Sequence, residues 1–380
     1  MLLEVVTALL LASASASAAD TNASQYAVHW ATLLPEPGKN RGGGTTYLNS
    51  MPLGNGHVAA NVLYDSGKLI VLIASSSAWS ESGELMKVAL LEVNLYDLDK
   101  TKPIAQTLDP QTATFTLSSG GKAVATVYID ANSDTLVMTR PSPPASPWPA
   151  TLTALRVDAA SGVGEVTPSF SCQPYTVSKD VAGKDGKFVF HRNENCTGPN
   201  NYMATTLAGE NIPSPSGFKD PLRLRATGAA VATSSEGGTT VVAVLTDDTG
   251  SSTAAGFEAA LGAAVKSALV GALSGMRQAH EAWWADKWAG HYIHVDTGGG
   301  GGGGDNVSDG ARLSQMYALE RYTQIIQARI PKSGVTFTPI KVRAAGASGA
   351  SGASGAGCCC LLLLLLLLLL LLRVCSFCYC

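Results

Sequence analysis

A long series of short β-rich runs, divided by turn residues, constrains the fold of this chain more than any other feature. The runs extend from Tyr26 to about Asp248, and glycine, aspartate, asparagine and serine separate them. No helical pattern lies between them, which favours an antiparallel sandwich over βαβ units. The runs are Val58–Tyr64, Lys68–Ile73, Val88–Tyr96, Thr112–Leu117, Ala123–Ile129, Thr135–Thr139, Thr151–Val157, Phe188–His191, Leu222–Ala226 and Thr240–Leu245.

Two turns in this region carry specific signals. Asp65-Ser66-Gly67 between two apolar runs predicts a β-hairpin. The segment from Gly54 to Ala59 matches a dinucleotide-binding pattern superficially, but no strand precedes it and a hairpin rather than a helix follows, so the match fails on context. Its glycines give the backbone freedom beside Asn55 and His57, which leaves either a surface site or a structural turn.

The pattern becomes helical near Ala254. Residues 254–290 lack proline, and His280, Trp284 and Trp288 recur at helical spacing on one face. Trp283 joins Trp284 and Trp288 in an aromatic cluster. Core packing is the favoured interpretation of this cluster, and a sugar-stacking platform is the alternative. After the glycine tract 298–304, a second helix is expected from an Asp309 cap to Arg329. Its broad apolar stripe consists of Leu313, Met316, Tyr317, Tyr322, Ile325 and Ile326.

Both ends of the chain differ in composition from the region between them. Residues 1–19 combine an apolar run with Ala16-Ser17-Ala18, which is typical of a cleaved signal peptide, although the usual basic residue is absent and Glu4 is present. Residues 344–380 hold an Ala-Gly-Ser repeat, cysteines and a poly-leucine run that is too short for an ordinary spanning helix. We interpret this segment as a non-native tail in preference to a membrane anchor.

Secretion would allow a disulfide between cysteines and glycosylation at asparagine sequons. Of the eight cysteines, only Cys172 and Cys196 lie before the tail, and in an oxidising compartment their disulfide would contribute about 3 kcal/mol; two separate thiols are the alternative. Asn22, Asn195 and Asn306 each begin an N-glycosylation sequon. The expected location is therefore secreted or extracellular.

Charge and spacing exclude several kinds of partner. The net charge is −3, with 14% charged residues and no basic block, so nucleic acid is a poor candidate. His291 and His294 lack further ligands in a recognisable pattern, and no metal site or cofactor is expected. The carboxylate pairs Glu81/Glu84 and Asp97/Asp99 cannot be assigned to acid–base catalysis from spacing alone.

One stretch resembles a known family. The string from Ser50 to Val62 contains Met-Pro-Leu-Gly-Asn-Gly, and Ala78-Trp79-Ser80-Glu81 begins a Trp-containing loop that ends at Lys87. These segments resemble the N-terminal β-sandwich of glycoside hydrolase family 95-like proteins, in particular the domain-of-unknown-function family 5703. Ser77 stands where that family usually has Asp, and His57 where a small acidic or polar residue is common.

Further likenesses extend over about residues 26–341. Gln106–Asp109 resembles the family's "Q.LD" turn, Ile129–Asn132 its "VDAN" strand, His280–Trp288 its helical linker and Thr338–Lys341 the start of "PIKFNG". The resemblance implies a mainly β fold: a large antiparallel supersandwich (20–250), a helical linker (251–296) and the first helix of an incomplete (α/α)6 barrel (297–343). The family's catalytic residues lie in the barrel, so none can be carried over to this chain.

The function implied is that of a non-catalytic β-sandwich portion of a secreted α-L-fucosidase-like protein acting on carbohydrate. Whether this chain is itself an enzyme stays open. A carbohydrate-binding module, contacting sugar through Asn55, His57 and Trp79 or Trp30, is the alternative. A surface protein anchored by the poly-leucine tail is a further one. An exposed apolar stripe on the last helix would favour the first reading, and a buried stripe the second.

Overall fold

We describe the protein from a computed structural model. The described residues are 23–30, 50–81, 83, 85–141, 147–155, 178–194, 207–213, 222–289, 293, 295 and 309–327. They belong to one unit that comprises Met1–Glu36 and Asn49–Val342. The signal peptide, both cysteines before the tail, the asparagines of all three sequons, the tail itself, His291 and His294 lie outside the described residues.

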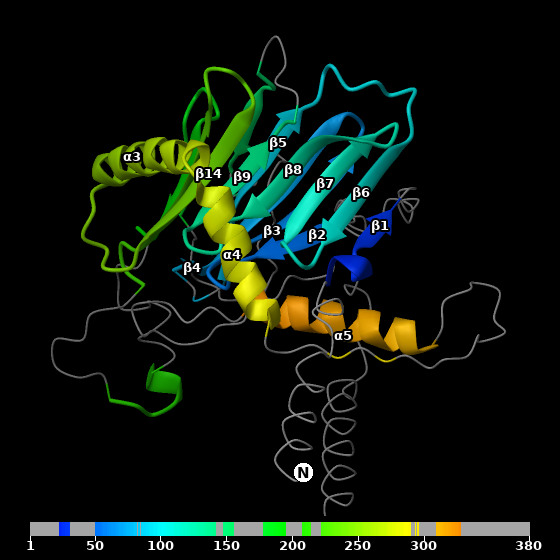
Figure 1. Cartoon of the computed structure of the whole chain (residues 1–380). Coiled ribbons are helices and arrows are strands. Elements are labelled where there is room, and N and C mark those ends of the chain that lie inside the picture. Colours follow the sequence, from blue (N-terminus) through cyan, green and yellow to red (C-terminus); the bar gives the residue numbers. More distant parts are fainter. Residues whose placement is uncertain are drawn as a thin grey trace, which may run out of the picture. The chain divides into compact units, whose positions relative to one another are not determined.

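The described strands form two antiparallel sheets of nine and five strands, which confirms the predicted sandwich (Figure 1). The larger sheet has the order β1-β6-β7-β8-β9-β14-β13-β12-β11. These strands are β1 (Val28–Trp30), β6 (Ile104–Asp109), β7 (Thr114–Ser119), β8 (Lys122–Ile129), β9 (Thr135–Thr139), β11 (Val181–Ala182), β12 (Phe188–Arg192), β13 (Ala226–Thr233) and β14 (Thr239–Asp247).

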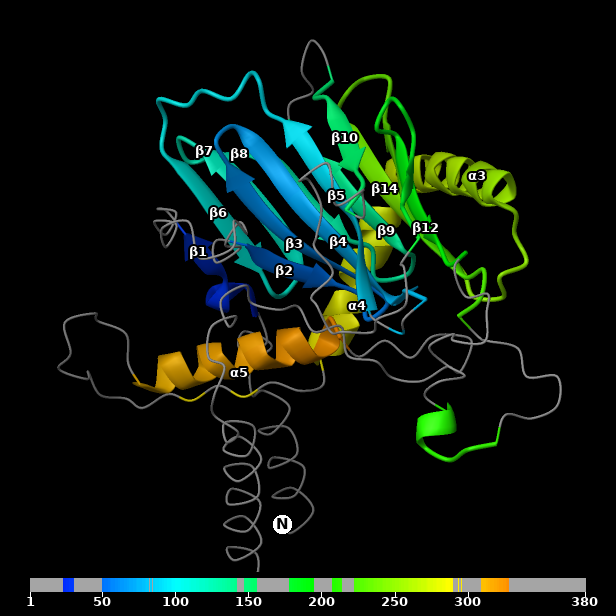
Figure 2. The same ribbon diagram turned by 180° about the vertical axis from the view of Figure 1, so that it is seen from behind.

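The smaller sheet has the order β10-β5-β4-β3-β2, and Figure 2 shows it from its outer side. Its strands are β2 (Met51–Gly54), β3 (Val58–Asp65), β4 (Lys68–Trp79), β5 (Leu85–Asn94) and β10 (Ala150–Thr153). The predicted hairpin is confirmed: Ser66 and Gly67 have φ angles of 48° and 89°, which suit a tight turn between β3 and β4.

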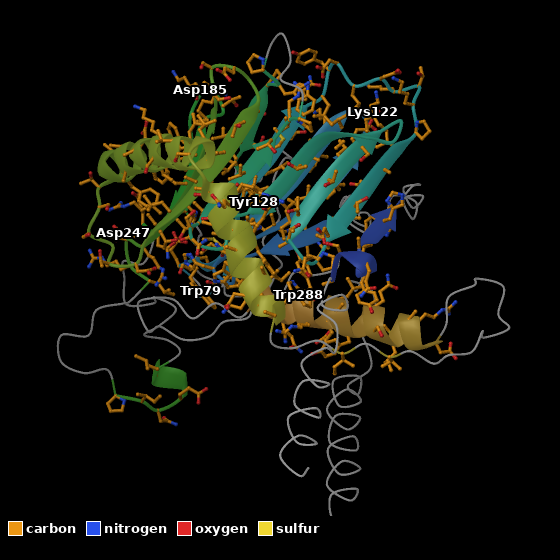
Figure 3. All side chains as sticks on the ribbon, in the orientation of Figure 1. Trp79, Lys122, Tyr128, Asp185, Asp247 and Trp288 are labelled. Carbon is orange, nitrogen blue, oxygen red and sulfur yellow. The ribbon has the colours of Figure 1, made fainter. Side chains whose placement is uncertain are left out.

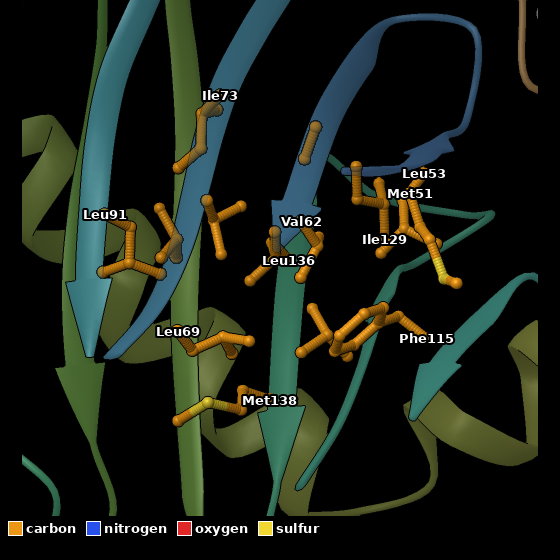
Figure 4. Packing of buried hydrophobic residues seen from close by; sticks show 14 of the residues in the cluster. Met51, Leu53, Val62, Leu69, Ile73, Leu91, Phe115, Ile129, Leu136 and Met138 are labelled. Carbon is orange, nitrogen blue, oxygen red and sulfur yellow. The ribbon is translucent and has the colours of Figure 1, made fainter. Parts of the chain in front are cut away.

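The core lies between the sheets. Leu69, Ile73 and Leu91 from the small sheet face Phe115 and Leu136 from the large one, and all five are at most 1% exposed (Figure 4). Alternating burial along β4 and β8 brings every second side chain into this layer. The sandwich therefore has one continuous apolar interior.

Three long helices follow the strands. Helix α3 (Ala254–Leu273) begins at a Thr253 cap and packs Phe257, Leu261 and Val265 in a second apolar cluster with residues of β12–β14. By length and composition it is the one described helix that could cross a membrane. Helix α4 (Met276–Ala289) and helix α5 (Asp309–Ile325) lead to the end of the sandwich near β2 (Figure 1). A short 3-10 helix, η1, spans Ala23–Tyr26.

Three local expectations were wrong. Met51–Gly54 is a strand, although none was expected before Asn55; Pro52 is tolerated there because the strand lies at the edge of the sheet. Gln106–Asp109 lies in β6 and is not a turn. Leu222–Arg225 is not a strand, and β13 begins at Ala226. Its alanines and Gly228 have low β-propensity, so the sequence pattern does not indicate this strand. A Cβ on Gly228 would lie 2.4 Å from Cβ of Phe190, so close strand packing requires glycine there.

Candidate functional site

The turn between β2 and β3 is built around the side chain of Asn55, which is 4% exposed. Its Nδ2 donates to the carbonyl oxygens of Asp130 and Ser133, both at 2.9 Å. Its Oδ1 accepts from the backbone N–H groups of His57 at 3.0 Å and Val58 at 2.8 Å. Two donors and two acceptor positions are all an amide has, so Asn55 has no polar capacity left for a ligand in this conformation.

The same turn holds helix α5. The N–H of Gly56 donates to the carbonyl of Ile326 at 2.8 Å, and the hydroxyl of Tyr322 donates to the carbonyl of Pro52 at 2.7 Å. Gly54 allows this approach, because a Cβ there would lie 2.8 Å from the Ile326 carbonyl oxygen. The Met-Pro-Leu-Gly-Asn-Gly segment is therefore a docking turn for the last described helix.

The apolar stripe predicted for α5 divides into two parts. Tyr322 and Ile326 are each 1% exposed, whereas Leu313 and Met316 are 55% and 68% exposed. The C-terminal half of the helix is thus buried against the sandwich and the N-terminal half presents apolar side chains to solvent. Neither of the two outcomes set out for this stripe holds for the whole helix.

The other two predicted binding residues lie beside the docking turn. His57 is half-buried at the start of β3, and Trp79 is half-buried at the end of β4, where its indole Nε1 donates to Ser76 at 2.9 Å. The N–H of Ser76 donates to the His57 carbonyl at 2.9 Å, which brings the two segments together. Both side chains keep partial access to solvent; Trp30, the alternative aromatic, lies on the large sheet instead.

Helix α4 is attached through its aromatic face, as expected for core packing. Trp284 and Trp288 are each 1% exposed, and Figure 3 shows Trp288 where α4 meets α5. The indole of Trp288 donates to the Pro110 carbonyl at 3.1 Å, and the ring of Trp284 stacks on Tyr322 at 5.7 Å between centroids. A buried His280 completes this attachment. The platform interpretation does not fit Trp284 or Trp288.

A second polar cluster was not predicted. The imidazole of His191 on β12 lies between two carboxylates, with Nε2 at 3.2 Å from Glu81 and Nδ1 at 3.1 Å from Asp180, and these side chains are 2%, 3% and 0% exposed. Burial raises the pKa of Glu81, but the hydrogen bond and charge of His191 and the Ser178 hydroxyl outweigh it and leave this pKa below its usual value. The cluster joins β4, β12 and the segment before β11.

The remaining candidates, the other carboxylates named from the sequence, do not belong to the docking turn or to the His191 cluster. Asp97 pairs with Arg140 at 2.9 Å, and Asp99 accepts from Thr101; both belong to the loop after β5, and each has a partner of its own. Glu84 lies outside the described residues. Among the described residues, no group of three or more His, Cys, Asp or Glu side chains is placed to hold a metal ion.

The fold and this arrangement define a class: a β-sandwich domain in which the turn between β2 and β3 anchors a following helical segment. A family model described as "Domain of unknown function (DUF5703)", for the N-terminal domain, matches residues 42–243. That is more than half of the chain, and the chain belongs to this family.

The other comparisons add less. No curated protein matches the chain. Among solved structures, a chain assigned as a kojibiose phosphorylase from human microbiome aligns with a TM-score of 0.40 and 12% identity. The alignment covers 81% of this chain and 40% of that one, so this protein spans less than half the length of that structure. A TM-score of this size does not establish a shared fold.

The structural role of Asn55 can be tested by measuring the free energy of unfolding of a variant. Asn55→Ala is expected to lower the free energy of unfolding by about 3 kcal/mol, because two buried carbonyls and two N–H groups lose their partner. Asn61→Ala removes the same side chain from β3, where its amide donates to the Ser50 hydroxyl at 3.2 Å; about 1 kcal/mol is expected there. Urea denaturation of the three proteins measures both values. Equal losses would contradict a structural role specific to Asn55.

Proposed function

We propose that this chain is the β-sandwich portion of a secreted carbohydrate-active protein of the glycoside hydrolase family 95 type, and that it does not hydrolyse glycosides itself. Its role is to carry and position the helical segment that follows the sandwich. Membership of the family fits this proposal, although the family is described as one of unknown function. The resemblance of the sequence to family 95 is the reason for proposing carbohydrate as the class of substrate.

The observation that carries the proposal is the use made of the docking turn. The residues that most resemble the family bind backbone groups of this chain: Asn55 holds the β8–β9 loop, while Gly56 and Pro52 hold α5. A ligand site built on Asn55 would instead leave its amide open to solvent. The turn is therefore better suited to positioning a helix than to recognising a sugar.

An activity panel tests the proposal. The purified full chain is expected to release no product from aryl glycosides, including aryl α-L-fucosides, above buffer. Turnover that persists through purification and disappears in Glu81→Gln would overturn it. Glycan binding without turnover, if lost in Trp79→Ala and kept in Trp30→Ala, would favour the carbohydrate-binding module that uses His57 and Trp79.

A further inference from the structure

Three half-buried polar side chains from three different elements meet next to the docking turn. His57 comes from the start of β3, Ser77 from the end of β4, and Asp134 from the residue before β9. The Nδ1 atom of His57 is 2.7 Å from Asp134 Oδ2, and its Nε2 atom is 3.0 Å from Ser77 Oγ. The imidazole therefore links a hydroxyl on one side to a carboxylate on the other.

The carboxylate decides which nitrogen of the neutral ring carries the proton. An ionised Asp134 only accepts, so Nδ1 of His57 must be the donor. In the neutral imidazole, Nε2 is then an acceptor and faces the Ser77 hydroxyl at hydrogen-bond distance. This order of hydroxyl, imidazole and carboxylate is the one that activates a serine nucleophile on several unrelated folds.

Backbone contacts hold each of the three residues in place. Asn55 accepts from the N–H of His57 and donates to the carbonyl of Ser133, so one buried amide fixes both His57 and the loop that carries Asp134. The carbonyl of Ser77 accepts from Arg225 Nε at 3.3 Å and from the Thr227 hydroxyl at 3.4 Å. The arrangement is pre-organised by the fold, which is what catalytic geometry requires.

The site is also accessible. The side chains of His57 and Asp134 are 21% and 31% exposed, unlike the fully buried cluster around His191. The Arg225 guanidinium, which pairs with Asp248, also donates to the Ser77 carbonyl and lies beside this serine. Positive charge near a forming oxyanion lowers the barrier to acyl transfer.

We propose that Ser77, His57 and Asp134 form an acyl-transfer site that hydrolyses carboxylic esters of small acyl groups, such as acetate. The activity goes beyond the proposed function, since it breaks an ester bond and no glycosidic bond. Ser77 is half-buried, and such a serine suits a short acyl group that can approach from solvent.

The reaction is balanced with these groups and water. Ser77 Oγ forms a bond to the carbonyl carbon while His57 Nε2 takes the hydroxyl proton. The tetrahedral intermediate collapses, the bond to the alcohol oxygen breaks, and His57 gives its proton to that oxygen. Water then attacks the acyl-serine with His57 as base, which releases the carboxylic acid and restores Ser77. Asp134 orients the ring and stabilises its charged form throughout.

A fluorophosphonate probe and p-nitrophenyl acetate test the proposal on the full-length chain. The probe is expected to label the wild type at Ser77, located by peptide mass spectrometry, and the ester to be hydrolysed above the buffer rate. Ser77→Ala should lose both the label and at least about 100-fold of the rate above buffer. Asp134→Asn should keep Ser77 but lower the rate at least about tenfold, because the ring adopts the wrong tautomer.

Ser76→Ala is the matched control, because Ser76 is the half-buried neighbour that bonds His57 and Trp79 through its backbone N–H and carbonyl. It should keep the label and the rate. Thermal unfolding of all variants shows whether they are folded; a folded Ser77→Ala protein that hydrolyses the ester like the wild type would overturn the proposal. So would labelling that is absent or lies on another residue. The glycoside panel reports separately on the proposed function.

Discussion

Lowering the pH from 7 to 4 is expected to cost this protein about 3 kcal/mol of folding free energy through His280 alone. Burial lowers the pKa of this imidazole from 6.5 to about 4. The unfolded chain takes up the proton near pH 6.5 and the folded protein only near pH 4. Stability from this group is therefore complete above pH 6.5, falls between pH 6.5 and 4, and levels off below.

The hydrogen bond that His280 Nδ1 accepts adds to burial in keeping the proton off the folded protein, whereas the bond to the Thr112 carbonyl acts the other way. The N–H of Ala131 donates to His280 Nδ1 at 3.1 Å, and Nε2 donates to the Thr112 carbonyl at 2.8 Å. A second ring proton would place Nδ1–H against the N–H of Ala131. Arg277 on the same helix, which lies over Tyr128 and pairs with Glu281, also disfavours a further positive charge.

Urea denaturation at a series of pH values measures the effect. His280→Gln should lower stability at pH 7 by about 2 kcal/mol and flatten the profile between pH 6.5 and 4. His29→Gln changes an exposed imidazole on β1 and should show the same pH dependence of stability as the wild type. If wild type and His280→Gln lose the same free energy across this range, His280 does not control the acid sensitivity.

His191→Ala is expected to destabilise the protein by about 3–5 kcal/mol at neutral pH, because it leaves two buried carboxylates without their shared partner. Glu81 and Asp180 are 3% and 0% exposed, so bulk solvent does not reach them in the folded protein. Protonation of Glu81 removes its charge, so the deficit should shrink as the pH is lowered. The low folded-state pKa of Glu81 means that its own contribution in the wild type is lost as the pH falls below about 4.5.

Lys68→Ala provides a comparison from the solvent-exposed side of the small sheet. Lys68 pairs with Glu92 at 3.0 Å, and their side chains are 49% and 32% exposed; a loss of at most about 1 kcal/mol is expected. Chemical denaturation of both variants at pH 7 and pH 4.5 completes the test. A His191→Ala deficit no larger than that of Lys68→Ala would show that the buried cluster contributes little.

The strand pattern allowed most of the sandwich to be predicted. Val58–Asp65 and Lys68–Trp79 extend runs that began at the predicted residues, and Thr135–Thr139 matches its predicted bounds. These segments alternate clearly or are rich in β-branched residues. β13 was missed because its pairing depends on close contact between Gly228 and Phe190, which only the neighbouring strand reveals.

The sites were harder to predict because they join residues distant in sequence. Asn55, His57 and Trp79 were selected from a short string, whereas Asp134 lies 77 positions after His57 and His191 lies 110 after Glu81. No local periodicity reports such pairs. The signals available were the departures at His57 and Ser77 from the family pattern, and these two residues contact each other in the folded protein.

Hydrogen exchange of the α5 amides tests the central claim, that the docking turn holds this helix. A Cβ at Gly54 would meet the Ile326 carbonyl at 2.8 Å, whereas one at Gly262 on α3 meets nothing within 4 Å. Amides of residues 318–326 should be protected like those of β3–β5 in the wild type and in Gly262→Ala. They should exchange at least about tenfold faster in Gly54→Ala, while the sandwich stays protected. Equally fast exchange of α5 in all three proteins, beside a protected sandwich, would contradict the claim.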